Sequence, residues 1–533
     1  MKKSKIAIVI GLMAWGLGTA AIQAADWPQW GGNSLGRNMA ANASGLPDKV
    51  EPGDFKQGTE DVDLKTSKNV KWVARLGTQS YGNPTISNGK VFVGTNNDFT
   101  RDPKHQGDKS ILLCLDEKTG AFLWQLVIPK LKSGKVNDWE SLGLLSSPTI
   151  VGNRIYVVTS RCEVLCLDTE GLANGNDGPY KDEGVYVHLD TGKPPATVGK
   201  QDGDIIWRYD MMDELGVFPH NASNCSVIVV GDMVYACTSN GQDWTHSNVP
   251  SPLSPSFIAL DAKTGELKGE DDAGIGPNIY HGQWSSPSYG VVNGKGQLFF
   301  GGGDGFCYAF EPKPVYDEDE DLDFLRKIWW YDANPPEYKK DKNGKEIKYP
   351  AAEGPNEINS TPVFYNNKVY VASGQDPEHG EGVGHLVCLD PSKKGDITKT
   401  GEVWSYKGIK RSISTVSIDK NNGLLFVGDF SGFVHCLDAD TGKLHWIYDM
   451  KAHMWGSTFV ADGKVYVGDE DGDFVVLASD KKMKVLSETY FPAPIYSTPV
   501  TANGVLYVAT QSHLYAVYDE ARAKSATDQK KTK

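Results

Sequence analysis

Side chains that could bind a ligand recur at one kind of position in the sequence, just ahead of short runs of β-branched and aromatic residues. The set contains His220, Asn224, His281, Gln283, Trp284, Glu357, Asn359, Arg411, His453, Trp455 and Tyr496. Aromatic rings with a few convergent polar groups and one arginine suit a planar, anionic or polyhydroxylated ligand. The alternative is structural, because the same groups would satisfy strand ends and fill a channel. We predict a binding site from the set as a whole and assign no catalytic residue.

Two further segments carry side chains that bind metals or ligands in other proteins. Residues 375–381, followed by His385, place carboxylates and imidazoles at a close spacing that could bind a divalent metal. A solvated acidic loop is the favoured interpretation of this segment. Residues 240–246 combine an acid, a tryptophan and a histidine and could clamp a ligand, but packing on a neighbouring loop is favoured. We therefore predict no metal site.

Other patterns give no support to several common activities. Residues 174–183 are rich in Asn and Asp but lack the spacing of an EF-hand, and the acidic run at 317–323 is interpreted as a solvated loop. The sequence has no Gly-x-Ser-x-Gly, His-Glu-x-x-His or phosphate-loop motif. Hydrolase and nucleotide-binding functions therefore gain no support.

The candidate residues are positioned by a repeated unit. A small polar pair and a proline often open the unit, a strand and a Gly- or Asn-containing turn follow, and a later strand ends in Leu-Asp before a Thr-Gly turn. The repeat is anchored at Pro84, Pro148, Val227, Pro287, Pro362, Val416, Phe459 and Pro499. The last spacings, 43 and 40 residues, match the length of one four-stranded propeller blade.

These units predict an all-β fold, an eight-bladed β-propeller of four-stranded antiparallel blades. Asn-Gly at 88–89, 293–294 and 503–504 indicates hairpin turns. A tryptophan on the fourth strand, as at Trp124 and Trp446, would pack over the neighbouring blade's turn. The last unit has three strands, and residues 70–75, which include Trp72, supply a spare one. We expect this N-terminal strand to close the ring.

Insertions are concentrated on one face of the predicted ring. Long loops between second and third strands fall at residues 96–109, 238–255 and 373–384. Long segments ahead of first strands fall at 211–223, 271–283 and 333–358. Both kinds of connection open on the same face of a propeller, and loops on a rigid scaffold commonly carry binding sites. We therefore place the predicted site in the central funnel of this face.

The predicted domain organisation is a signal peptide at 1–24, an N-terminal extension packing on the propeller at 25–68, the propeller at 69–520 and a disordered polar tail at 521–533. Lys2, Lys3 and Lys5 precede an apolar run that ends in small residues, which is typical of a cleaved export signal. No further apolar run could span a membrane, and no cysteine precedes Cys114, so no lipid anchor is expected. We predict a periplasmic or secreted protein.

Net charge and cysteines add two constraints. The formal charge of −14 argues against nucleic-acid binding, which requires a basic surface.

Five cysteines share one third-strand position on different blades and should be too far apart to pair. Cys225 and Cys237 flank a turn and could be bridged, a question that the sequence leaves open. Nothing in the sequence indicates an oligomeric state.

The repeats Cys-Leu-Asp-x-x-Thr-Gly-x-x-x-Trp at 114–124 and 436–446, with Asp-Trp-Pro-Gln-Trp-Gly-Gly at 26–32, resemble the pyrroloquinoline-quinone (PQQ) type repeat family. That family includes periplasmic quinoprotein alcohol dehydrogenases and a lipoprotein scaffold of the outer-membrane protein assembly machinery. The resemblance implies the propeller fold for residues 70–520. The chain lacks the adjacent cysteine pair of the dehydrogenases and the Cys-x-x-Cys-His motif of c-type haem.

Two functions are consistent with this resemblance. The first is a non-catalytic binding module of the cell envelope, with a small-molecule ligand or an envelope protein at the funnel face and no certain cofactor. The second is a quinoprotein oxidoreductase that depends on PQQ and Ca²⁺. In that case Trp284 or Trp455 would stack on the quinone, Asn224, Glu357 and Asn359 would supply oxygens to Ca²⁺, and Arg411 would pair with a cofactor carboxylate.

Overall fold

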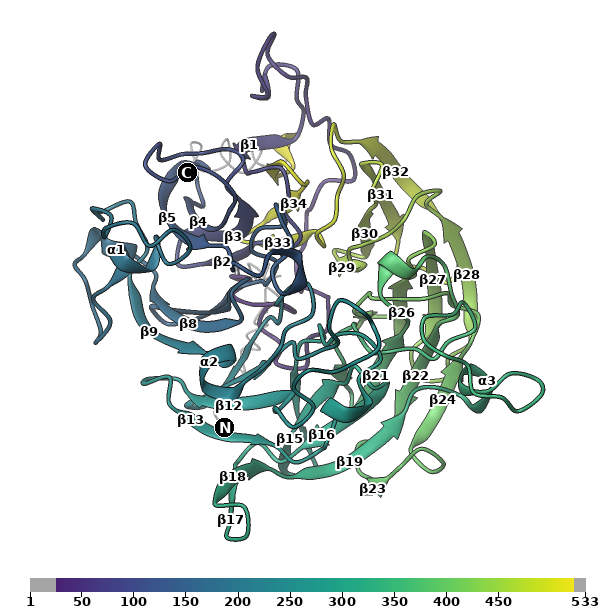
Figure 1. Cartoon of the computed structure of the whole chain (residues 1–533). Coiled ribbons are helices and arrows are strands. Elements are labelled where there is room, and N and C mark those ends of the chain that lie inside the picture. The colour runs from purple at the N-terminus through teal and green to yellow at the C-terminus, as the bar shows by residue number, and fades with distance from the viewer. Residues whose placement is uncertain (1–24, 522–533) are drawn as a thin grey trace, which may run out of the picture.

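The structure, a computed structural model, describes residues 25–521, so the predicted signal peptide and residues 522–533 of the predicted tail lie outside the described residues. Eight antiparallel sheets stand around a central axis (Figure 1). Blades 1 to 4 have these main strands: β2 (Thr85–Ser87), β3 (Lys90–Asn96), β4 (Lys109–Asp116) and β5 (Phe122–Pro129); β6 (Thr149–Val151), β7 (Arg154–Val158), β8 (Glu163–Asp168) and β9 (Ile205–Asp210); β10 (Ile228–Val230), β11 (Met233–Cys237), β12 (Phe257–Asp261) and β13 (Leu267–Asp271); β14 (Ser288–Val292), β15 (Lys295–Gly301), β16 (Phe306–Phe310) and β19 (Lys327–Asp332).

Blades 5 to 8 complete the ring. Their strands are β20 (Val363–Tyr365), β21 (Lys368–Ser373), β22 (His385–Leu389) and β24 (Glu402–Tyr406); β25 (Ser417–Asp419), β26 (Leu424–Gly428), β27 (Phe433–Asp438) and β28 (Leu444–Asp449); β29 (Phe459–Ala461), β30 (Lys464–Gly468), β31 (Asp473–Ala478) and β32 (Val485–Tyr490); β33 (Val500–Ala502), β34 (Val505–Ala509) and β35 (His513–Val517) with β1 (Val70–Arg75). β1 pairs antiparallel with β35, with Val70 opposite Val517 and Arg75 opposite His513. The prediction of an eight-bladed propeller closed by an N-terminal strand is confirmed.

Blades 3 and 4 differ from the regular four-stranded plan. The acidic run 317–323, interpreted above as a solvated loop, belongs to a hairpin of β17 (Val315–Asp317) and β18 (Leu322–Leu325). β18 continues the sheet of blade 3 by pairing parallel with β13, and β23 (Gly395–Asp396) similarly pairs with β19. These additions cover outer strand edges that would otherwise present unpaired backbone groups.

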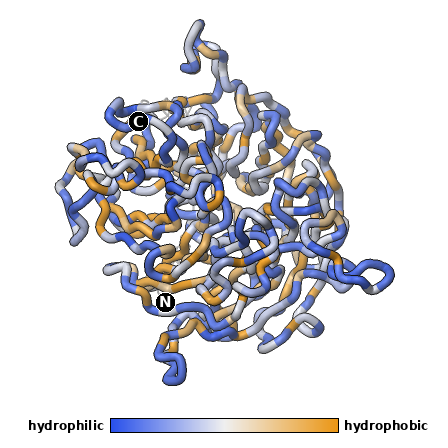
Figure 2. Tube along the Cα trace, in the orientation of Figure 1, coloured by the Kyte–Doolittle hydropathy of each residue, from blue (hydrophilic) through white to orange (hydrophobic). Residues whose placement is uncertain are grey.

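Short helices occur only in the connections of the described chain. They are α1 (Glu183–Tyr186), α2 (Met211–Leu215) and α3 (Pro336–Lys339), with 3₁₀ turns η1 (Gly134–Val136), η2 (Gly171–Ala173), η3 (Gly276–Asn278) and η4 (Pro377–His379). None of the helices within residues 25–521 is long and apolar enough to cross a lipid bilayer. Hydrophobic residues recur along the strands, whereas the outermost loops are mainly hydrophilic (Figure 2).

Fourth-strand tryptophans close the seams between blades, as the repeat predicted. The indole N–H of Trp72 donates to the Glu117 carbonyl, and that of Trp207 donates to the Ala262 carbonyl, at 3.0 and 3.1 Å. A Cβ added to Gly120 would lie only 2.6 Å from the Trp72 ring. The Thr-Gly turn therefore needs glycine because the indole of the preceding blade lies directly on it.

The small polar pairs that open the repeats form a belt of hydrogen bonds that joins six of the eight seams around the channel of the described structure. In this belt a backbone N–H of one blade donates to a side-chain oxygen of the next. The bonds run from Asn83 to Ser147, Ser147 to Ser226, Ser226 to Ser286, Thr415 to Ser457, Ser457 to Thr498 and Thr498 to Asn83, at 2.8–3.0 Å. The belt supplies hydrogen bonds across seams that have no strand ladder, and it explains why Ser, Thr or Asn recurs at this position.

Residues 25–46, here called the strap, line the inner edges of the first strands near the middle of the ring (Figure 1). Its hydrogen bonds to these strands join Trp27 to Ile86, Pro28 to Ile150, Leu35 to Tyr289, Gly36 to Phe364, Asn38 to Ile418 and Met39 to Val460. Each partner lies one or more residues into its strand, beyond the end where the funnel loops begin. The strap therefore lies on the channel side of these strands, below the funnel.

Arg37 anchors the strap. Its side chain is fully buried and donates to the carbonyl oxygens of Trp30, Ser226, Val227 and Pro287 at 2.6–3.1 Å. One guanidinium thus joins the strap to blade 3 and to the segment that enters blade 4. A planar group with five N–H donors can satisfy several buried carbonyls at once.

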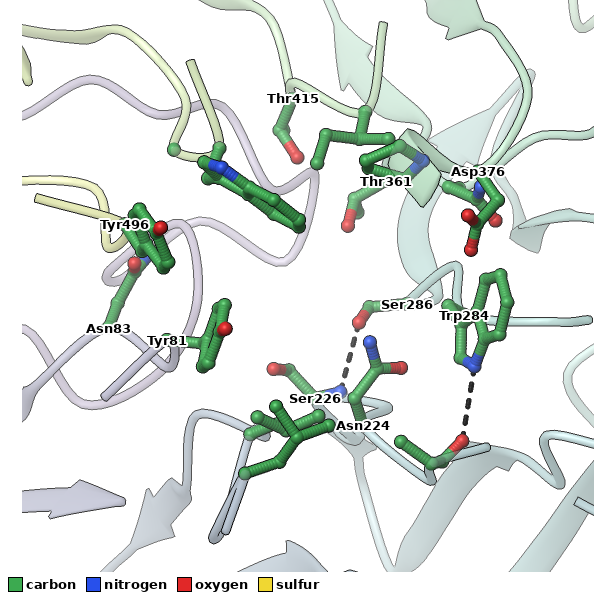
Figure 3. Close-up of a pocket in the computed structure, with 18 of the residues that line it drawn as sticks. Tyr81, Asn83, Asn224, Ser226, Trp284, Ser286, Thr361, Asp376, Thr415 and Tyr496 are labelled. Atoms are coloured by element: carbon green, nitrogen blue, oxygen red, sulfur yellow. Dashed lines mark hydrogen bonds between the residues drawn. The ribbon is translucent and has the colours of Figure 1, made fainter. Parts of the chain in front are cut away.

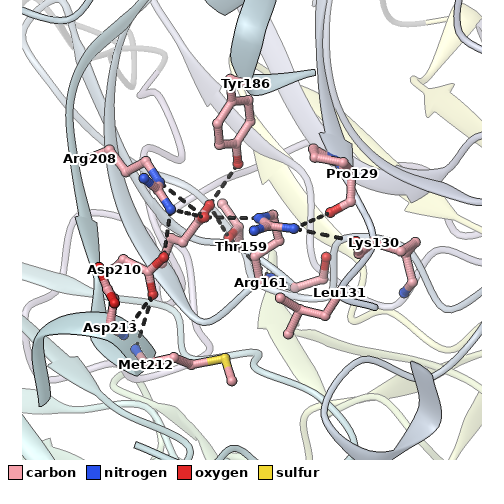
Figure 4. Close-up of polar contacts among 12 residues, drawn as sticks. Pro129, Lys130, Leu131, Thr159, Arg161, Tyr186, Arg208, Asp210, Met212 and Asp213 are labelled. Atoms are coloured by element: carbon pink, nitrogen blue, oxygen red, sulfur yellow. Dashed lines mark hydrogen bonds and ion pairs between the residues drawn. The ribbon is translucent and has the colours of Figure 1, made fainter. Parts of the chain in front are cut away.

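A second buried charge cluster fixes the segment that leaves blade 1 (Figure 4). Glu163 is fully buried at the start of β8 and accepts hydrogen bonds from Arg161, Arg208 and Tyr186 at 2.8–2.9 Å. Arg161 also donates to the carbonyls of Pro129 and Lys130 at 3.3 Å. The cluster therefore holds the start of the segment that runs from β5 to β6 and carries Trp139 to the funnel.

The cysteines are buried free thiols throughout the described chain. Cys114, Cys166, Cys307, Cys388 and Cys436 lie on third strands of five different blades. Cys225 and Cys237 are neighbours but are not bridged, and the Cys237 backbone N–H donates to the Cys225 sulfur at 3.2 Å.

The substitution Arg37→Met should lower the free energy of unfolding by about 3 kcal/mol, because it leaves buried carbonyls without donors. Urea denaturation measures the change, and limited proteolysis after residue 25 reports whether the strap still docks. Arg326→Met is the matched control: Arg326 is one-third exposed, and its surface ion pairs should contribute about 0.5 kcal/mol. Equal effects of the two substitutions would contradict the anchoring role of Arg37.

The substitution Glu163→Gln should destabilise the protein by about 3 kcal/mol, because it removes the only carboxylate that contacts both Arg161 and Arg208 in the described cluster. Chemical denaturation measures this loss. Glu266→Gln is the control, since Glu266 forms an exposed pair with Lys268. A loss no larger than in the control would show that the cluster is not needed for stability.

Candidate functional site

A pocket of about 350 Å³ opens at the funnel, and all eight blades contribute to it. The contributing residues lie just ahead of the first strands, and residues 376–378 of the β21–β22 loop add to the rim. Trp30 of the strap also lines the pocket. The volume is within the range that binds small organic ligands.

Aromatic rings form two opposite walls (Figure 3). On one side the Tyr496 ring stacks on Trp455 at 5.1 Å, and Tyr81 lies 5.1 Å from Tyr496. Trp284 stands on the other side, where its indole N–H donates to the Ala222 carbonyl at 3.1 Å. Burial raises the pKa of Tyr81 well above its usual value, so this phenol stays protonated and able to donate. The walls offer flat apolar faces with polar edges.

Amides and hydroxyls fill the space between the walls. The lining hydroxyls of Ser226, Ser286 and Thr498 accept belt hydrogen bonds from backbone N–H groups, so their own O–H groups are available to donate. The side-chain oxygens of Asn224 and Asn359 are buried and have no hydrogen-bond partner among the described residues. A ligand with several hydroxyl groups would find both donors and acceptors here.

The charged groups of the pocket are acidic. Asp376 and Glu378 lie at its rim, and none of the described lining residues is a lysine, arginine or histidine. The pocket therefore favours neutral or cationic ligands over anionic ones.

The eleven predicted site residues fall into two groups. Those that line the pocket are Asn224, Trp284, Asn359, Trp455 and Tyr496. Those outside its lining are His220, His281, Gln283, Glu357, Arg411 and His453. The second group is buried behind the wall, except for His453.

Most of this second group supports the loops behind the wall. Gln283 donates to the Asn240 carbonyl at 3.1 Å, and the fully buried Glu357 accepts from the Asn359 amide at 2.9 Å. Burial, and then the nearby Asp376, raise the pKa of Glu357 well above its usual value. Arg411 donates to the backbone carbonyl of Asp376 at 2.6 Å and so fixes the β21–β22 loop instead of facing the pocket.

His453 lies on the rim. Its Nδ1 atom is 2.8 Å from Glu470, and its ring stacks on Phe430 at 4.4 Å. Glu470 also accepts from the indole N–H of Trp455 at 3.1 Å. His453 therefore helps to orient one aromatic wall through a shared carboxylate.

Side chains outside the predicted set also reach this region. Trp139 and Asp376 line the pocket, and His246 and His379 lie with His220 and His281 behind Trp284. The only sequence signal for the last two was their place in segments 240–246 and 375–381. His385 is separate from this group, because its Nδ1 lies 2.8 Å from the Ala333 carbonyl.

Comparison with known proteins identifies the repeat. A family model described as outer membrane protein assembly factor BamB matches residues 108–310 and 384–487, which are more than half of the chain. A curated protein, outer membrane protein assembly factor BamB of Nitrosomonas eutropha, is 26% identical over 142 residues, which cover 24% of this chain and 34% of that protein. The chain thus matches about a third of that relative's length.

Two solved structures align with most of the chain. BamB from Moraxella catarrhalis aligns with a TM-score of 0.52 at 14% identity, over 84% of this chain and 98% of that chain. Quinohemoprotein alcohol dehydrogenase from Comamonas testosteroni aligns with a TM-score of 0.46 at 13% identity, over 92% and 80%. With the family match over more than half its length, the chain belongs to the PQQ-repeat propeller family represented by outer membrane protein assembly factor BamB.

Proposed function

We propose that this protein is an exported binding module of the cell envelope whose funnel pocket takes a small polyhydroxylated ligand, neutral or cationic, such as a sugar or an amino sugar. The observation that carries the proposal is the pocket itself. Trp284 faces Tyr81 and Tyr496 across it, with amide and hydroxyl groups between them and carboxylates at the rim.

The physical basis is the match between these walls and such a ligand. Sugar rings present apolar faces that pack on aromatic rings, and their hydroxyl groups need donors and acceptors at the edge. The free oxygens of Asn224 and Asn359 supply acceptors, and the belt hydroxyls supply donors. Asp376 and Glu378 would add attraction for an amino group.

The same pocket does not fit PQQ, the cofactor that the family resemblance implies. PQQ carries three carboxylates, and the described lining residues include no cation to pair with them. Arg411, the arginine expected in that role, is fully buried and donates to Asp376 and Gln375. The quinoprotein oxidoreductase therefore ranks below the binding module.

The second candidate function is binding of a protein partner at the funnel face. It is favoured by the family match, because the representative of the family is by name an assembly factor. The long loops that surround the funnel, at 96–109, 238–255 and 373–384, would offer the contact surface in that case.

Isothermal titration calorimetry of the purified protein with cellobiose and glucosamine tests the proposal. Saturable binding is expected, and Trp284→Ala should weaken it about 10-fold by removing one stacking wall. Trp330→Ala is the control, since Trp330 lies on β19 outside the pocket lining.

PQQ with Ca²⁺ forms the contrasting arm of the titration. Saturable PQQ binding that Trp284→Ala abolishes, without any response to the sugars, would overturn the proposal in favour of the oxidoreductase. Absence of binding in both arms would leave the protein-partner function as the better explanation.

A further inference from the structure

Four imidazole rings meet behind Trp284, although they come from separate segments of three blades. His220 precedes β10, His246 lies in the β11–β12 loop, His281 precedes β14, and His379 ends η4 in the β21–β22 loop. His281 is central, with ring centroids 4.1 Å from His220, 4.8 Å from His246 and 4.8 Å from His379. Asp376 completes the group, with a carboxylate oxygen 3.7 Å from Nδ1 of His281.

The nitrogen atoms of these rings converge at distances that suit metal ligation. Two sets of three residues each bring one ligand atom per residue within 4.8 Å of one another. The first set is His220, His246 and His281, and the second is His281, Asp376 and His379. The two sets share His281. Ligands of a single ion held at about 2.1 Å would lie about 3–4 Å apart, so small side-chain rotations bring these atoms onto one ion.

Most of these nitrogens have no other role in the described structure. Nε2 of His220, Nε2 of His246, both ring nitrogens of His281 and Nδ1 of His379 are buried without a hydrogen-bond partner. His220 and His281 are each only 1% exposed. Buried polar atoms are normally satisfied, and a cluster of unsatisfied ones requires an explanation such as a bound ion.

The tautomer of His220 is already set for ligation. Its Nδ1 atom lies 2.6 Å from the Gln242 carbonyl oxygen, which only accepts, so Nδ1 carries the proton and Nε2 presents a lone pair. Metal-binding histidines are commonly oriented by such a bond from the other ring nitrogen to a backbone carbonyl.

We propose that His220, His246, His281, His379 and Asp376 bind one divalent transition-metal ion of the Zn²⁺ class. Imidazole nitrogens dominate the donor set, and such sets select Zn²⁺ and its neighbours over Ca²⁺ and Mg²⁺, which prefer oxygen ligands. The carboxylate of Asp376 supplies a negative charge that offsets part of the charge of the ion.

The site adjoins the funnel pocket but does not depend on the proposed ligand. Asp376 lines the pocket, and the Trp284 ring that forms its wall lies 5.4 Å from the His281 ring. An ion at this site would tie the β11–β12 and β21–β22 loops together behind the aromatic wall. Loss of metal binding and loss of sugar binding are therefore separate measurements.

The test is metal binding by the full-length purified protein after chelator treatment and reloading with Zn²⁺ or Co²⁺ alone. We expect about one equivalent of Zn²⁺ per chain by elemental analysis, visible absorption bands of histidine-bound Co²⁺ and a higher Tm with Zn²⁺. Since loss of even an outer partner weakens metal affinity about 10- to 100-fold, His281→Ala should weaken it by at least that factor.

His246→Ala provides a second variant that is safer for folding, because His246 is only partly buried in a loop. It should also lose the Co²⁺ bands. His385→Ala is the matched control, as a buried histidine outside the cluster, and it should bind metal like the wild type. Failure of the reloaded wild type to bind either ion, or equal binding by His281→Ala and His385→Ala, would overturn the proposal.

Discussion

The central constraint on this molecule is that the four main strands of one blade form no hydrogen-bond ladder with the main strands of the next blade. Side chains therefore hold much of each seam, and the described structure uses two sets of them at different radii. Near the axis, belt bonds such as Ser147 to Ser226 join one blade to the next. Farther out, indoles such as Trp207 pack on the following blade's turn. The pocket lies inside the belt, so the same hydroxyls that hold the ring together also face the ligand space.

The fold could be predicted because its signals are local and repeat in every blade. Trp124 and Trp446 each belong to the same short motif, and the spare strand around Trp72 identified the closure. The hairpin at 315–325 was not predicted, because an acidic run resembles a solvated loop until its partner strand β13 is known. Its pairing partner lies about fifty residues earlier, in a different blade, so no local pattern reports it.

The candidate site could be predicted only in part, because contacts between different blades leave no local pattern in the sequence. Position ahead of a first strand does not tell which side chains turn toward the pocket. Trp455 and Tyr496 face the pocket, whereas Arg411 turns back to bond with the β21–β22 loop. His246 and His379 lie in loops of blades 3 and 5 and are brought together only by the packing of these blades around blade 4. The residues next to each histidine in the sequence give no sign that the other histidine lies close to it in the fold.

The strap has a consequence for how the chain reaches its native state. Its residues are synthesised before any blade, yet Met39 bonds to Val460 and the Ala25 carbonyl accepts from Asn503 in the last two blades. These two contacts can form only after almost the entire polypeptide has been made. Trp30 of the strap lines the pocket, so the strap forms part of the pocket wall. The wall of the pocket is therefore complete only when the strap is docked.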